Sequence, residues 1–452
     1  MVRKAGNHGL DGLQDCTDGM EGYKRTEVGV IADHGLDGLQ DFTDGMEGYK
    51  RTEVGVIPVD WEVKKLGELF KFKNGVNAEK KHYGKGIKFI NILEVIQNNS
   101  LFYEDIPGFI TLDAGTMKSN IVQKGDVLFN RTSETQEEIG LTAVYLDDKE
   151  VVFGGFVIRA RPISDLINYY FSKYGFSSKS VRNQIIKKGQ GAVRANIGQS
   201  DLKEVFISLP PLHEQKTIAL ALSDTDALIA ACDRAITKKR NIKQGAMQQL
   251  LTGKVRLPGF SGEWEVKKLG DISFVNQGLQ IAIEKRLKNP LPNSKKYITI
   301  QFLNNAKEIE YINEYSSSVC CNEDDILMTR TGNTGIVVSN VSGVFHNNFF
   351  KINFDRKILD KNYLIGYLNL DKIQNLILAK AGTSTIPDLN HNDFYSIPVS
   401  FPPLPEQKAI AQILSDMDAE IAALEKKRDK YKAIKQGMMQ ELLTGKTRLN
   451  TD

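Results

Sequence analysis

The segment "LPPLHEQKTIALALSDTDALIAACDRAITKKRNIKQGAMQQLLTGKVRL" (209–257) decides the fold, because the chain contains it twice. The second copy, "FPPLPEQKAIAQILSDMDAEIAALEKKRDKYKAIKQGMMQELLTGKTRL", covers 401–449, so each residue stands 192 positions after its counterpart. A shorter pair, "DWEVKKLGEL" (60–69) and "EWEVKKLGDI" (263–272), precedes the two copies. Self-similarity of this kind indicates a tandem duplication. We therefore predict two units, each a variable globular stretch followed by a repeated helix.

Apolar residues in both copies alternate spacings of four and three residues. This is the a/d pattern of helices that pair along their length. An ordinary amphipathic core helix would explain one such pattern, whereas two copies that close two similar units favour pairing with each other. The pattern is carried by Thr225, Cys232 and Met417 and by the residues to which we assign the pairing: Ile218, Leu222, Ile229, Ile236, Ile410, Leu414, Ile421 and Leu424.

The sequence also indicates where the repeated helices end. Gly253 and Gly445 follow the last apolar pair of each copy, where a residue in the left-handed conformation ends a helix. Inside each copy, a serine followed three residues later by an aspartate could cap a restart, at 223–226 and 415–418. A single long helix and a short helix followed by a long one both remain open.

The two variable stretches differ in sequence but share a mixed texture. "GDVLFNRTSETQEEIGLTAVY" (125–145) and "DDILMTRTGNTGIVVSN" (324–340) each lead an apolar strand into Arg-Thr, then a polar loop, then another strand-like run. Near the end of each stretch lies a turn rich in Gly, Thr and Asn, "KKGQGAVRANIGQSDL" (187–202) and "AKAGTSTIPDLNHNDF" (379–394). The fold class expected from this texture is α/β (α+β).

The first 57 residues contain a repeat of a different kind. "GLDGLQDCTDGMEGYKRTEVGVI" (9–31) recurs at 35–57 with only Cys16 changed, to Phe42. Two Gly- and Asp-rich copies are too few and too polar to bury a core. We interpret the repeat as a recent duplication, in which the first copy is a loose tail and the second leads into the first domain.

Composition is that of an ordinary soluble globular protein, with 41% hydrophobic and 25% charged residues. No apolar run is long enough to span a bilayer and the start does not resemble a signal peptide, so we expect a cytoplasmic protein. The spacing of the cysteines predicts neither a zinc site nor a disulfide framework. These cysteines are Cys16, Cys232, Cys320 and Cys321.

Positive charge is concentrated in one place. The net charge of +3 does not by itself announce a nucleic-acid binder. Residues 235–257, however, contain six cations and no acid, which fits either a solvated helix face or an anionic partner. The cations are Lys238, Lys239, Arg240, Lys243, Lys254 and Arg256.

These features together resemble the specificity subunit of type I restriction-modification systems. The resemblance covers 58–449 and rests on "PPLHEQKTIA" and "PPLPEQKAIA", the two glycine-terminated helix ends, the "WEVKKLG" openings, and the "NRTS" and "TRTG" strand ends. It implies two target-recognition domains, each reading one half of a bipartite double-stranded DNA sequence. It also implies two conserved helices that pair as an antiparallel coiled coil with pseudo-two-fold symmetry. The doubled N-terminal segment departs from this pattern.

The resemblance further implies that the chain itself performs no catalysis and holds neither metal nor cofactor. Two modification subunits would dock on the helices and methylate adenine with S-adenosylmethionine, which they bind themselves. Translocating restriction subunits would join them. The predicted division of the chain is an N-terminal segment (1–57), a first recognition domain (58–212), a central helical spacer (213–254), a second recognition domain (255–404), a distal helical spacer (405–446) and a tail (447–452).

DNA contacts should come from cationic and polar side chains on loops, which bind phosphates and base edges. A loop-capping threonine or a surface arginine is the plain alternative for each. Because Arg131 and Arg330 occupy the same position in both halves, we expect them to have a shared structural or phosphate-binding role. The candidates are Arg131, Thr132, Lys187, Lys188, Gln190 and Arg194 in the first domain, and Arg330, Thr331, Asn333, Lys380, Thr383 and Ser384 in the second.

Three other functions are compatible with parts of the sequence. A nuclease could be argued from Glu62-x-Lys64 and Glu265-x-Lys267, but neither has a consistent acidic partner. A coiled-coil assembly scaffold would bind DNA without reading its sequence and with strong salt dependence. A type IIB-like system, in which cleavage and methylation share one polypeptide, would use a similar specificity subunit.

Overall fold

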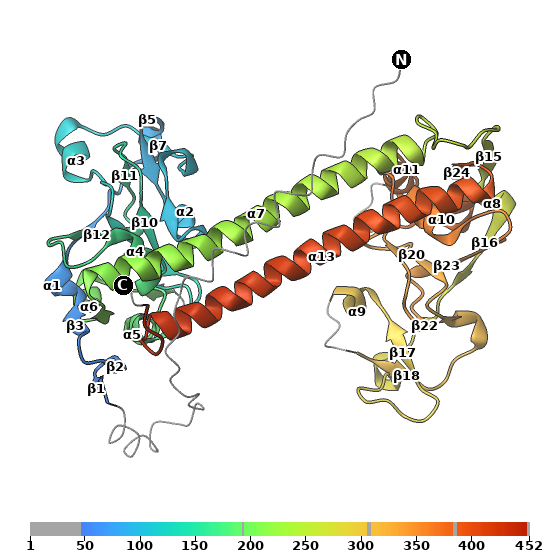
Figure 1. The fold of residues 1–452 in the computed structure, drawn as a ribbon. Coiled ribbons are helices and arrows are strands. Elements are labelled where there is room, and N and C mark those ends of the chain that lie inside the picture. The colour runs from blue at the N-terminus through green and yellow to red at the C-terminus, as the bar shows by residue number, and fades with distance from the viewer. Residues whose placement is uncertain (1–46, 192–193, 305–308, 383–386, 450–452) are drawn as a thin grey trace. The chain divides into compact units, whose positions relative to one another are not determined.

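The protein is described here by a computed structural model that covers residues 47–191, 194–304, 309–382 and 387–449 (Figure 1). Two compact units divide the chain. Unit 1 combines the residues up to Ala231 with those from Arg428 onward, and unit 2 is Cys232–Lys427. Each long helix therefore begins in one unit and ends in the other. The loose tail expected for the first N-terminal copy lies outside the described residues.

Unit 1 is built on a five-stranded sheet with strand order β4-β12-β8-β10-β6. A smaller sheet of order β11-β5-β7 lies next to it in the same unit. The strands of the large sheet are β4 (Phe70–Asn74), β12 (Val157–Pro162), β8 (Val127–Asn130), β10 (Thr142–Tyr145) and β6 (Ser100–Leu101). Those of the small sheet are β11 (Val152–Phe153), β5 (Tyr83–Ile90) and β7 (Phe109–Ile110).

The two faces of the large sheet are covered differently. One face packs into the main core of unit 1, with Phe72, Phe129 and Ile158 facing α4 and α5. Near β8 and β10 the other face packs into a smaller core that includes Leu128 and Tyr145. The helices and short strands of unit 1 that precede the first long helix are α1 (Leu66–Leu69), α2 (Ile92–Gln97), α3 (Ala114–Ser119), β9 (Thr132–Ser133), α4 (Tyr169–Gly175), α5 (Lys179–Lys188), β13 (Ala195–Asn196) and α6 (Gln199–Lys203).

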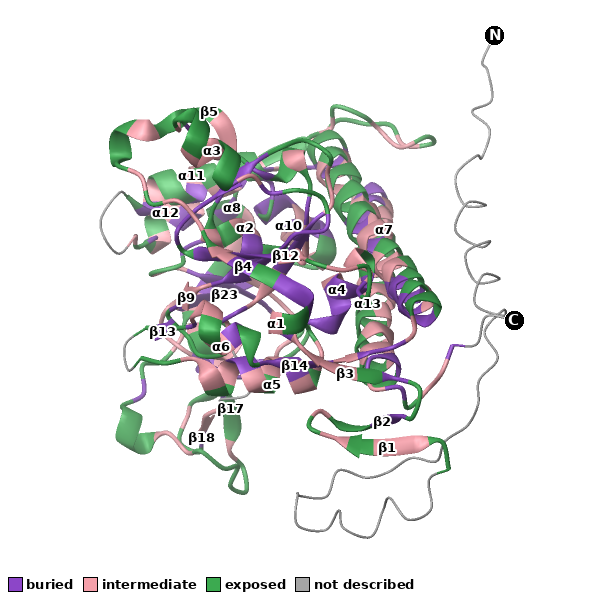
Figure 2. Ribbon diagram, turned by 90° about the vertical axis from the view of Figure 1, so that its left-hand side faces the viewer, coloured by how far each residue is buried: buried purple, intermediate pink, exposed green. Residues whose placement is uncertain are grey.

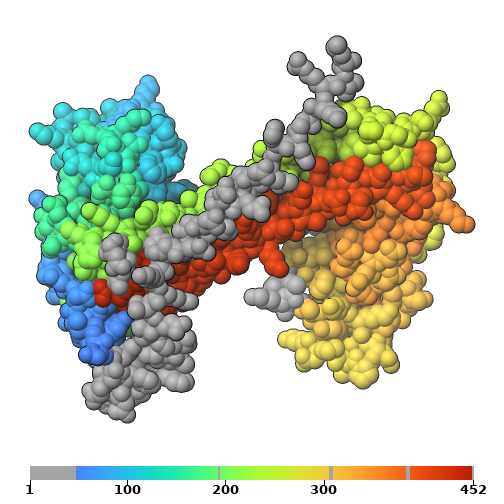
Figure 3. Space-filling view, viewed as in Figure 1, coloured from blue at the N-terminus to red at the C-terminus, as the bar shows by residue number. Residues whose placement is uncertain are grey.

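The globular part of unit 1 is closed by its first and last strands. β3 (Glu62–Lys65) pairs antiparallel with β14 (Phe206–Leu209), so the chain returns to its entry point just before the first long helix. A hairpin of β1 (Tyr49–Thr52) and β2 (Gly55–Pro58) precedes it. The Tyr49 hydroxyl donates to the Gly445 carbonyl over 3.0 Å, which joins the two ends of the described chain (Figure 3).

Unit 2 repeats this plan with different sheets. β15 (Glu265–Lys268) pairs antiparallel with β24 (Pro398–Phe401). Between them lie two four-stranded sheets, of orders β16-β23-β20-β21 and β18-β17-β22-β19. The elements are α8 (Leu269–Ile272), β16 (Ser273–Gln277), β17 (Lys295–Ile298), α9 (Ile300–Asn304), β18 (Tyr311–Ile312), β19 (Cys320–Cys321), β20 (Ile326–Thr329), β21 (Val337–Val338), β22 (Gly343–Phe345), β23 (Phe349–Phe354), α10 (Lys361–Leu368), α11 (Asp371–Ala381) and α12 (His391–Tyr395).

The repeated segments form two long helices, α7 (Leu212–Leu250) and α13 (Leu404–Leu442), of 39 residues each. Neither helix is interrupted, which excludes the alternative of a short helix followed by a long one. Gly253 and Gly445 both have φ of +70°, so the predicted left-handed stops are confirmed. The mixture of helix and sheet in two similar units also confirms the predicted fold class.

The helices run antiparallel where they meet within each unit. In unit 1, Asp226 of α7 pairs with Lys435 of α13 over 2.6 Å. In unit 2, three ion pairs join the helices, and from Lys239 to Lys243 of α7 the partner on α13 moves back from Glu420 to Asp418. These pairs are Lys239–Glu420 at 2.6 Å, Arg240–Glu425 at 2.5 Å and Lys243–Asp418 at 2.5 Å.

The residues assigned to helix pairing are distributed unequally. Ile218 and Leu222 lie in the main core of unit 1, where the end of α13 also packs, and Ile410 and Leu414 lie in the main core of unit 2 with the end of α7. Ile236 and Ile421 are buried outside these cores, and Ile229 and Leu424 are half-buried. In α13 the buried residues lie between Glu406 and Ile421 and again at Leu442, whereas 422–441 are half-buried or exposed; Figure 2 shows the burial of both helices.

Three of the cysteines lie in the described ranges. Cys232, Cys320 and Cys321 are all free thiols. Burial raises the pKa of the Cys321 thiol to about 11, which keeps it protonated. Within the described ranges, no helix has both the length and the apolar character needed to cross a membrane.

Candidate nucleic-acid interface and helix junctions

The Arg-Thr pair at the end of one strand is held by the same backbone frame in both units. In unit 1, the Arg131 N–H donates to the Phe156 carbonyl, and the Arg131 carbonyl accepts from Ile197. In unit 2, the Arg330 N–H donates to Asn348, and its carbonyl accepts from Leu389, which stands 192 residues after Ile197. The frame therefore joins the two stretches of each unit that the sequence singled out.

The threonine of each pair bonds to an equivalent neighbour of different chemistry. The Thr132 hydroxyl lies 2.8 Å from the Asn196 side-chain oxygen. The Thr331 hydroxyl donates to the Asp388 carboxylate over 2.6 Å, and Asp388 stands 192 residues after Asn196. Unit 1 thus presents an amide where unit 2 presents a carboxylate, on a shared scaffold.

The two arginines have different surroundings. Arg131 is half-buried and donates to the Gly155 carbonyl over 3.3 Å. Arg330 pairs with the Asp388 carboxylate at 2.9 Å and lies over the ring of Phe350 at 5.3 Å. Its side chain is only 15% exposed, so internal contacts account for most of its surface.

We call Arg131, Thr132 and Asn196 the Arg-Thr corner of unit 1, and Arg330, Thr331 and Asp388 that of unit 2. The other candidates of unit 1 lie near its corner. Lys187 and Lys188 form the last turn of α5, where cations also stabilise a helix end electrostatically. Gln190 exchanges two backbone hydrogen bonds with Asn196, and Arg194 is exposed, 3.7 Å from Glu134. Thr132 and Glu134 therefore lie close to Asn196 and Arg194.

In unit 2 the candidates also converge. Asn333 is exposed in the loop after β20, and its carbonyl accepts from the Thr329 hydroxyl. Lys380 lies in α11, whose last residue, Ala381, accepts from the Asp388 N–H. Thr383 and Ser384 lie outside the described residues.

The "PPL-EQ" motif at the start of each long helix has a structural role that sequence analysis missed. The Gln215 side chain donates to the Leu166 and Pro210 carbonyls, at 2.9 Å each, and accepts from the Asn168 N–H at 2.8 Å. Gln407 makes the equivalent three bonds, to Ile358, Pro402 and Asp360, at 2.8–2.9 Å. The repetition of the motif was the only signal for this role, and its partners could not be read from it.

The buried glutamate of each motif forms an ion pair with an arginine that follows the other long helix. Glu214 and Glu406 are each only 1% exposed. In unit 1, Arg448 donates two hydrogen bonds of 2.8 Å to Glu214 and two more to Asp60. Its guanidinium holds the pKa of the Asp60 carboxyl below the usual range. In unit 2, Arg256 donates hydrogen bonds of 2.6 and 2.5 Å to Glu406.

The nuclease reading finds no support in the geometry of its residues. Glu62 pairs with Lys64 at 3.2 Å, and Glu265 pairs with Lys267 at 2.7 Å, on the strands that open each unit. Among the described residues, no three His, Cys, Asp or Glu side chains gather where they could hold a metal ion. These residues therefore fit a domain-opening strand.

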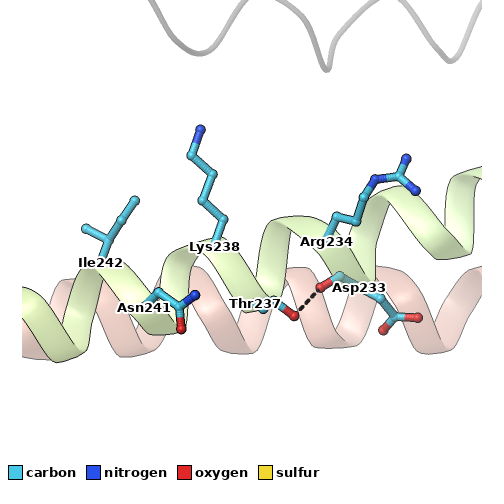
Figure 4. Close-up of a pocket in the computed structure, with 6 residues that line it drawn as sticks. All are labelled: Asp233, Arg234, Thr237, Lys238, Asn241 and Ile242. Atoms are coloured by element: carbon cyan, nitrogen blue, oxygen red, sulfur yellow. Dashed lines mark hydrogen bonds between the residues drawn. The ribbon is translucent and has the colours of Figure 1, made fainter.

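Among the described residues, one face of α7 is turned away from α13. Arg234, Lys238 and Ile242 project from the helix away from α13 (Figure 4). Ile242 is 47% exposed between basic neighbours. In the basic run 235–257, Lys239, Arg240 and Lys243 bond to α13, so only part of the run forms a free cationic surface.

The duplicated architecture corresponds to a known family. The profile of the type I restriction modification DNA specificity domain matches residues 58–241 and again residues 261–435. The chain belongs to this family. As a specificity subunit it is the non-catalytic component of a type I restriction-modification system, and its family implies recognition of a DNA target.

Individual relatives agree with this specificity-subunit assignment. The chain is 28% identical to the putative type I restriction enzyme MjaX specificity subunit of Methanocaldococcus jannaschii, over 87% of this chain and 95% of that one. It is 24% identical to the MjaVIII specificity subunit of the same organism, over 87% and 94%. The crystal structure of the type I S subunit from M. genitalium matches the fold with a TM-score of 0.53 at 17% identity, over 87% of this chain and 97% of that one.

Proposed function

We propose that this specificity subunit reads a bipartite, non-palindromic DNA target, with one half-site for each unit. The observation that carries the proposal is the Arg-Thr corner. Both units hold it with the same backbone hydrogen bonds, yet Asn196 in one is Asp388 in the other. A shared frame with different side chains is what two readers of different half-sites require, because base edges differ in their donors and acceptors.

We propose that the corner and its neighbouring loops form the DNA-binding surface of each unit. Cations such as Lys187 and Lys188 at the end of α5 would position phosphates, and the side chains that differ between the units would read bases. Arg330 and Thr331 would act through their bonds to Asp388, which they orient. The proposed contacts are Arg131, Thr132, Lys187, Lys188, Gln190 and Arg194 in unit 1, and Arg330, Thr331, Asn333, Lys380, Thr383 and Ser384 in unit 2.

The helices would serve as a spacer and as the docking surface for partner subunits. A split target requires a rigid separation between its readers, as dimer geometry fixes half-site spacing in other DNA-binding proteins. Modification subunits that carry S-adenosylmethionine would dock along α7 and α13, where Ile242 and its basic neighbours are exposed, and restriction subunits would join them. The assembly would work in the cytoplasm. Its functional parts would follow the division into recognition domains (58–212 and 255–404) and helical spacers (213–254 and 405–446).

Single-molecule methylation sequencing tests the proposal. DNA would be taken from a methylation-deficient host that expresses this chain with its neighbouring modification subunit. We expect N6-methyladenine on both strands of a split motif, and none when this chain is omitted. A soluble complex of the two proteins that methylates no defined motif would refute sequence reading.

Two alternatives predict other results. A coiled-coil scaffold that does not read sequence would bind target and non-target DNA with the same affinity and the same salt dependence. A type IIB-like system would give the same split motif, but its partner would cleave DNA without a separate restriction subunit.

A further inference from the structure

One edge of the large sheet in unit 1 places four cations on a single face, although one of them, Arg159, is buried and only 7% exposed. Phe70 and Phe72 of β4 point into the main core. Because successive side chains of a strand point to opposite faces, Lys71 and Lys73 point to the other face. The antiparallel register places Arg159 of β12 opposite Lys73, and Arg161 opposite Lys71. We call these four residues the cationic strip: Lys71, Lys73, Arg159 and Arg161.

The strip is poorly neutralised from within. Like charges directly opposite each other on paired strands destabilise a sheet. Asp126, which is 1% exposed, accepts two bonds of 2.9 and 2.7 Å from Arg161 and lies 3.9 Å from Arg159. Burial together with the charges of Arg159 and Lys71 lowers the pKa of Lys73. Four cations therefore share one buried carboxylate.

Three members of the strip are held in place by backbone carbonyls. Lys73 donates to the Ser119 carbonyl over 2.5 Å, and Arg161 donates to the Ile121 carbonyl over 2.9 Å. Arg159 also donates to the Ile121 carbonyl. These bonds satisfy donors but add no negative charge, because a carbonyl has no net charge, so the neutralisation of the strip still comes from Asp126. Lys71 is exposed, and no described side chain or carbonyl bonds to its ammonium group.

Protection of the sheet edge explains only half of the strip. Lysines on an edge strand prevent pairing with another chain, and β4 is an edge strand. Arg159 and Arg161, however, lie on β12, which has a neighbour on both sides. Bonds to Asp126 and to the Ile121 carbonyl hold these arginines, but one carboxylate does not balance four cations, and an anionic partner would offset the remaining charge.

The corresponding edge of unit 2 has no such strip. There β16 pairs with β23, and the register places Asn276 opposite Lys351 and Phe274 opposite Asn353. Lys351 is the only cation among these four, and it donates to the Cys320 carbonyl over 2.9 Å. Phe274 is 60% exposed where unit 1 has Lys71. The feature is therefore particular to unit 1 and not a requirement of the duplicated fold.

We propose that the accessible part of the cationic strip, exposed Lys71 with half-buried Lys73 and Arg161, binds the phosphate backbone of DNA beside the half-site that unit 1 reads. This proposal rests on the proposed function, and it adds a surface that the corner residues do not include. Prepositioned cations lose little conformational freedom on binding, and phosphates offset their mutual repulsion. The contact is asymmetric, because only unit 1 provides it.

The test is the salt dependence of DNA binding by the complex of this chain with its modification subunit. Lys71→Gln combined with Lys73→Gln removes two cations. Each lost phosphate contact reduces the slope of log K against log salt by about 0.9 on duplex DNA, so the expected slope is shallower by about 2, on target and non-target duplexes alike. Lys71→Gln alone, which breaks no bond of the described structure, should give about half of this change.

The matched control is Lys179→Gln combined with Lys203→Gln, which removes two exposed lysines from α5 and α6 of the same unit. Its slope should equal that of the unmodified complex. The proposal is overturned if the strip variants keep the original slope, or if the control variant changes it equally. Should the unmodified complex show no preference for any sequence, the proposed function fails, and the slopes on non-target DNA still decide whether the strip contacts phosphates.

Discussion

In unit 1, Arg448 bridges two carboxylates, those of Asp60 and Glu214, whereas its counterpart in unit 2, Arg256, reaches Glu406 and the Gly262 carbonyl. The indole N–H group of the opening tryptophan also has an acceptor in unit 1 and lacks one in the described part of unit 2. Trp61 donates to Glu214 over 2.9 Å, while the Trp264 N–H is buried without an acceptor among the described residues.

The reason for this difference is the connectivity of the chain. In unit 2, the end of α7 continues through 251–263 directly to Trp264, so covalent bonds keep the junction together. In unit 1, the end of α13 meets Trp61 from the opposite end of the chain, and only side chains hold it there. A contact between chain ends must overcome a larger entropy of ordering, so it needs more bonds.

Removing the buried glutamates is the strongest test of this comparison. Glu214→Ala leaves Arg448 and the Trp61 N–H without their main acceptor, and we expect it to destabilise unit 1 by about 4 kcal/mol. Glu406→Ala should cost unit 2 about 3 kcal/mol, because no indole bond is lost. Hydrogen exchange of peptides from 206–222 and 398–414 measures the two local free energies of unfolding. Trp61→Phe, which removes the indole bond and part of a fully buried ring but leaves Arg448 bonded to Glu214, is the comparison variant. An equal loss in both units would contradict the comparison.

Replacing the glycine that ends each long helix should also cost unit 1 more stability than unit 2. A side chain at φ of +70° costs about 1–2 kcal/mol in either unit. A Cβ on Gly445 would also lie 2.5 Å from Pro58, whereas one on Gly253 would lie 3.3 Å from Trp264. We expect Gly445→Ala to cost about 3 kcal/mol and Gly253→Ala about 1–2 kcal/mol. Thermal unfolding of both variants measures this, and a larger effect at Gly253 would show that the junction of unit 1 is the looser one.

The interhelical ion pairs sharpen the comparison at a smaller scale. Asp226 and Asp418 are counterparts, but Lys173 and Tyr174 also bond to Asp226, and its side chain is 26% exposed against 60% for Asp418. Although burial raises the pKa of Asp226, its bonds to Lys435, Tyr174 and Lys173 outweigh burial and lower it.

Because the folded pKa of Asp226 is lowered, its stabilisation exists above the unfolded pKa of about 3.9 and disappears as pH falls through the folded pKa. We expect Asp226→Asn to cost about 1–2 kcal/mol at pH 7 and almost nothing in strong acid. Asp418→Asn should cost less than about 0.5 kcal/mol at any pH. Denaturant titrations between pH 2 and 7 compare the two variants, and a pH-independent loss for Asp226→Asn would exclude this electrostatic account.

Local patterns predicted the frame of the molecule well. The heptad spacing and Gly253 predicted a long helix and its end, and the strands before Arg131 and Arg330 form where the apolar runs indicated. These features depend on neighbours in sequence. The bond between Arg448 and Asp60 joins residues 388 apart, and the cationic strip depends on strand register, so neither could be read from local sequence.

The measurement that tests the account most directly is the methylated motif of a variant with shorter helices. Removing 228–234 from α7 and 427–433 from α13 takes one heptad from segments that face each other, because Asp226 pairs with Lys435. Seven residues span about 10 Å of helix, which corresponds to about three base pairs. The account predicts two unchanged half-sites separated by an unread spacer about three base pairs shorter. Altered half-sites, or an unchanged spacer, would contradict it.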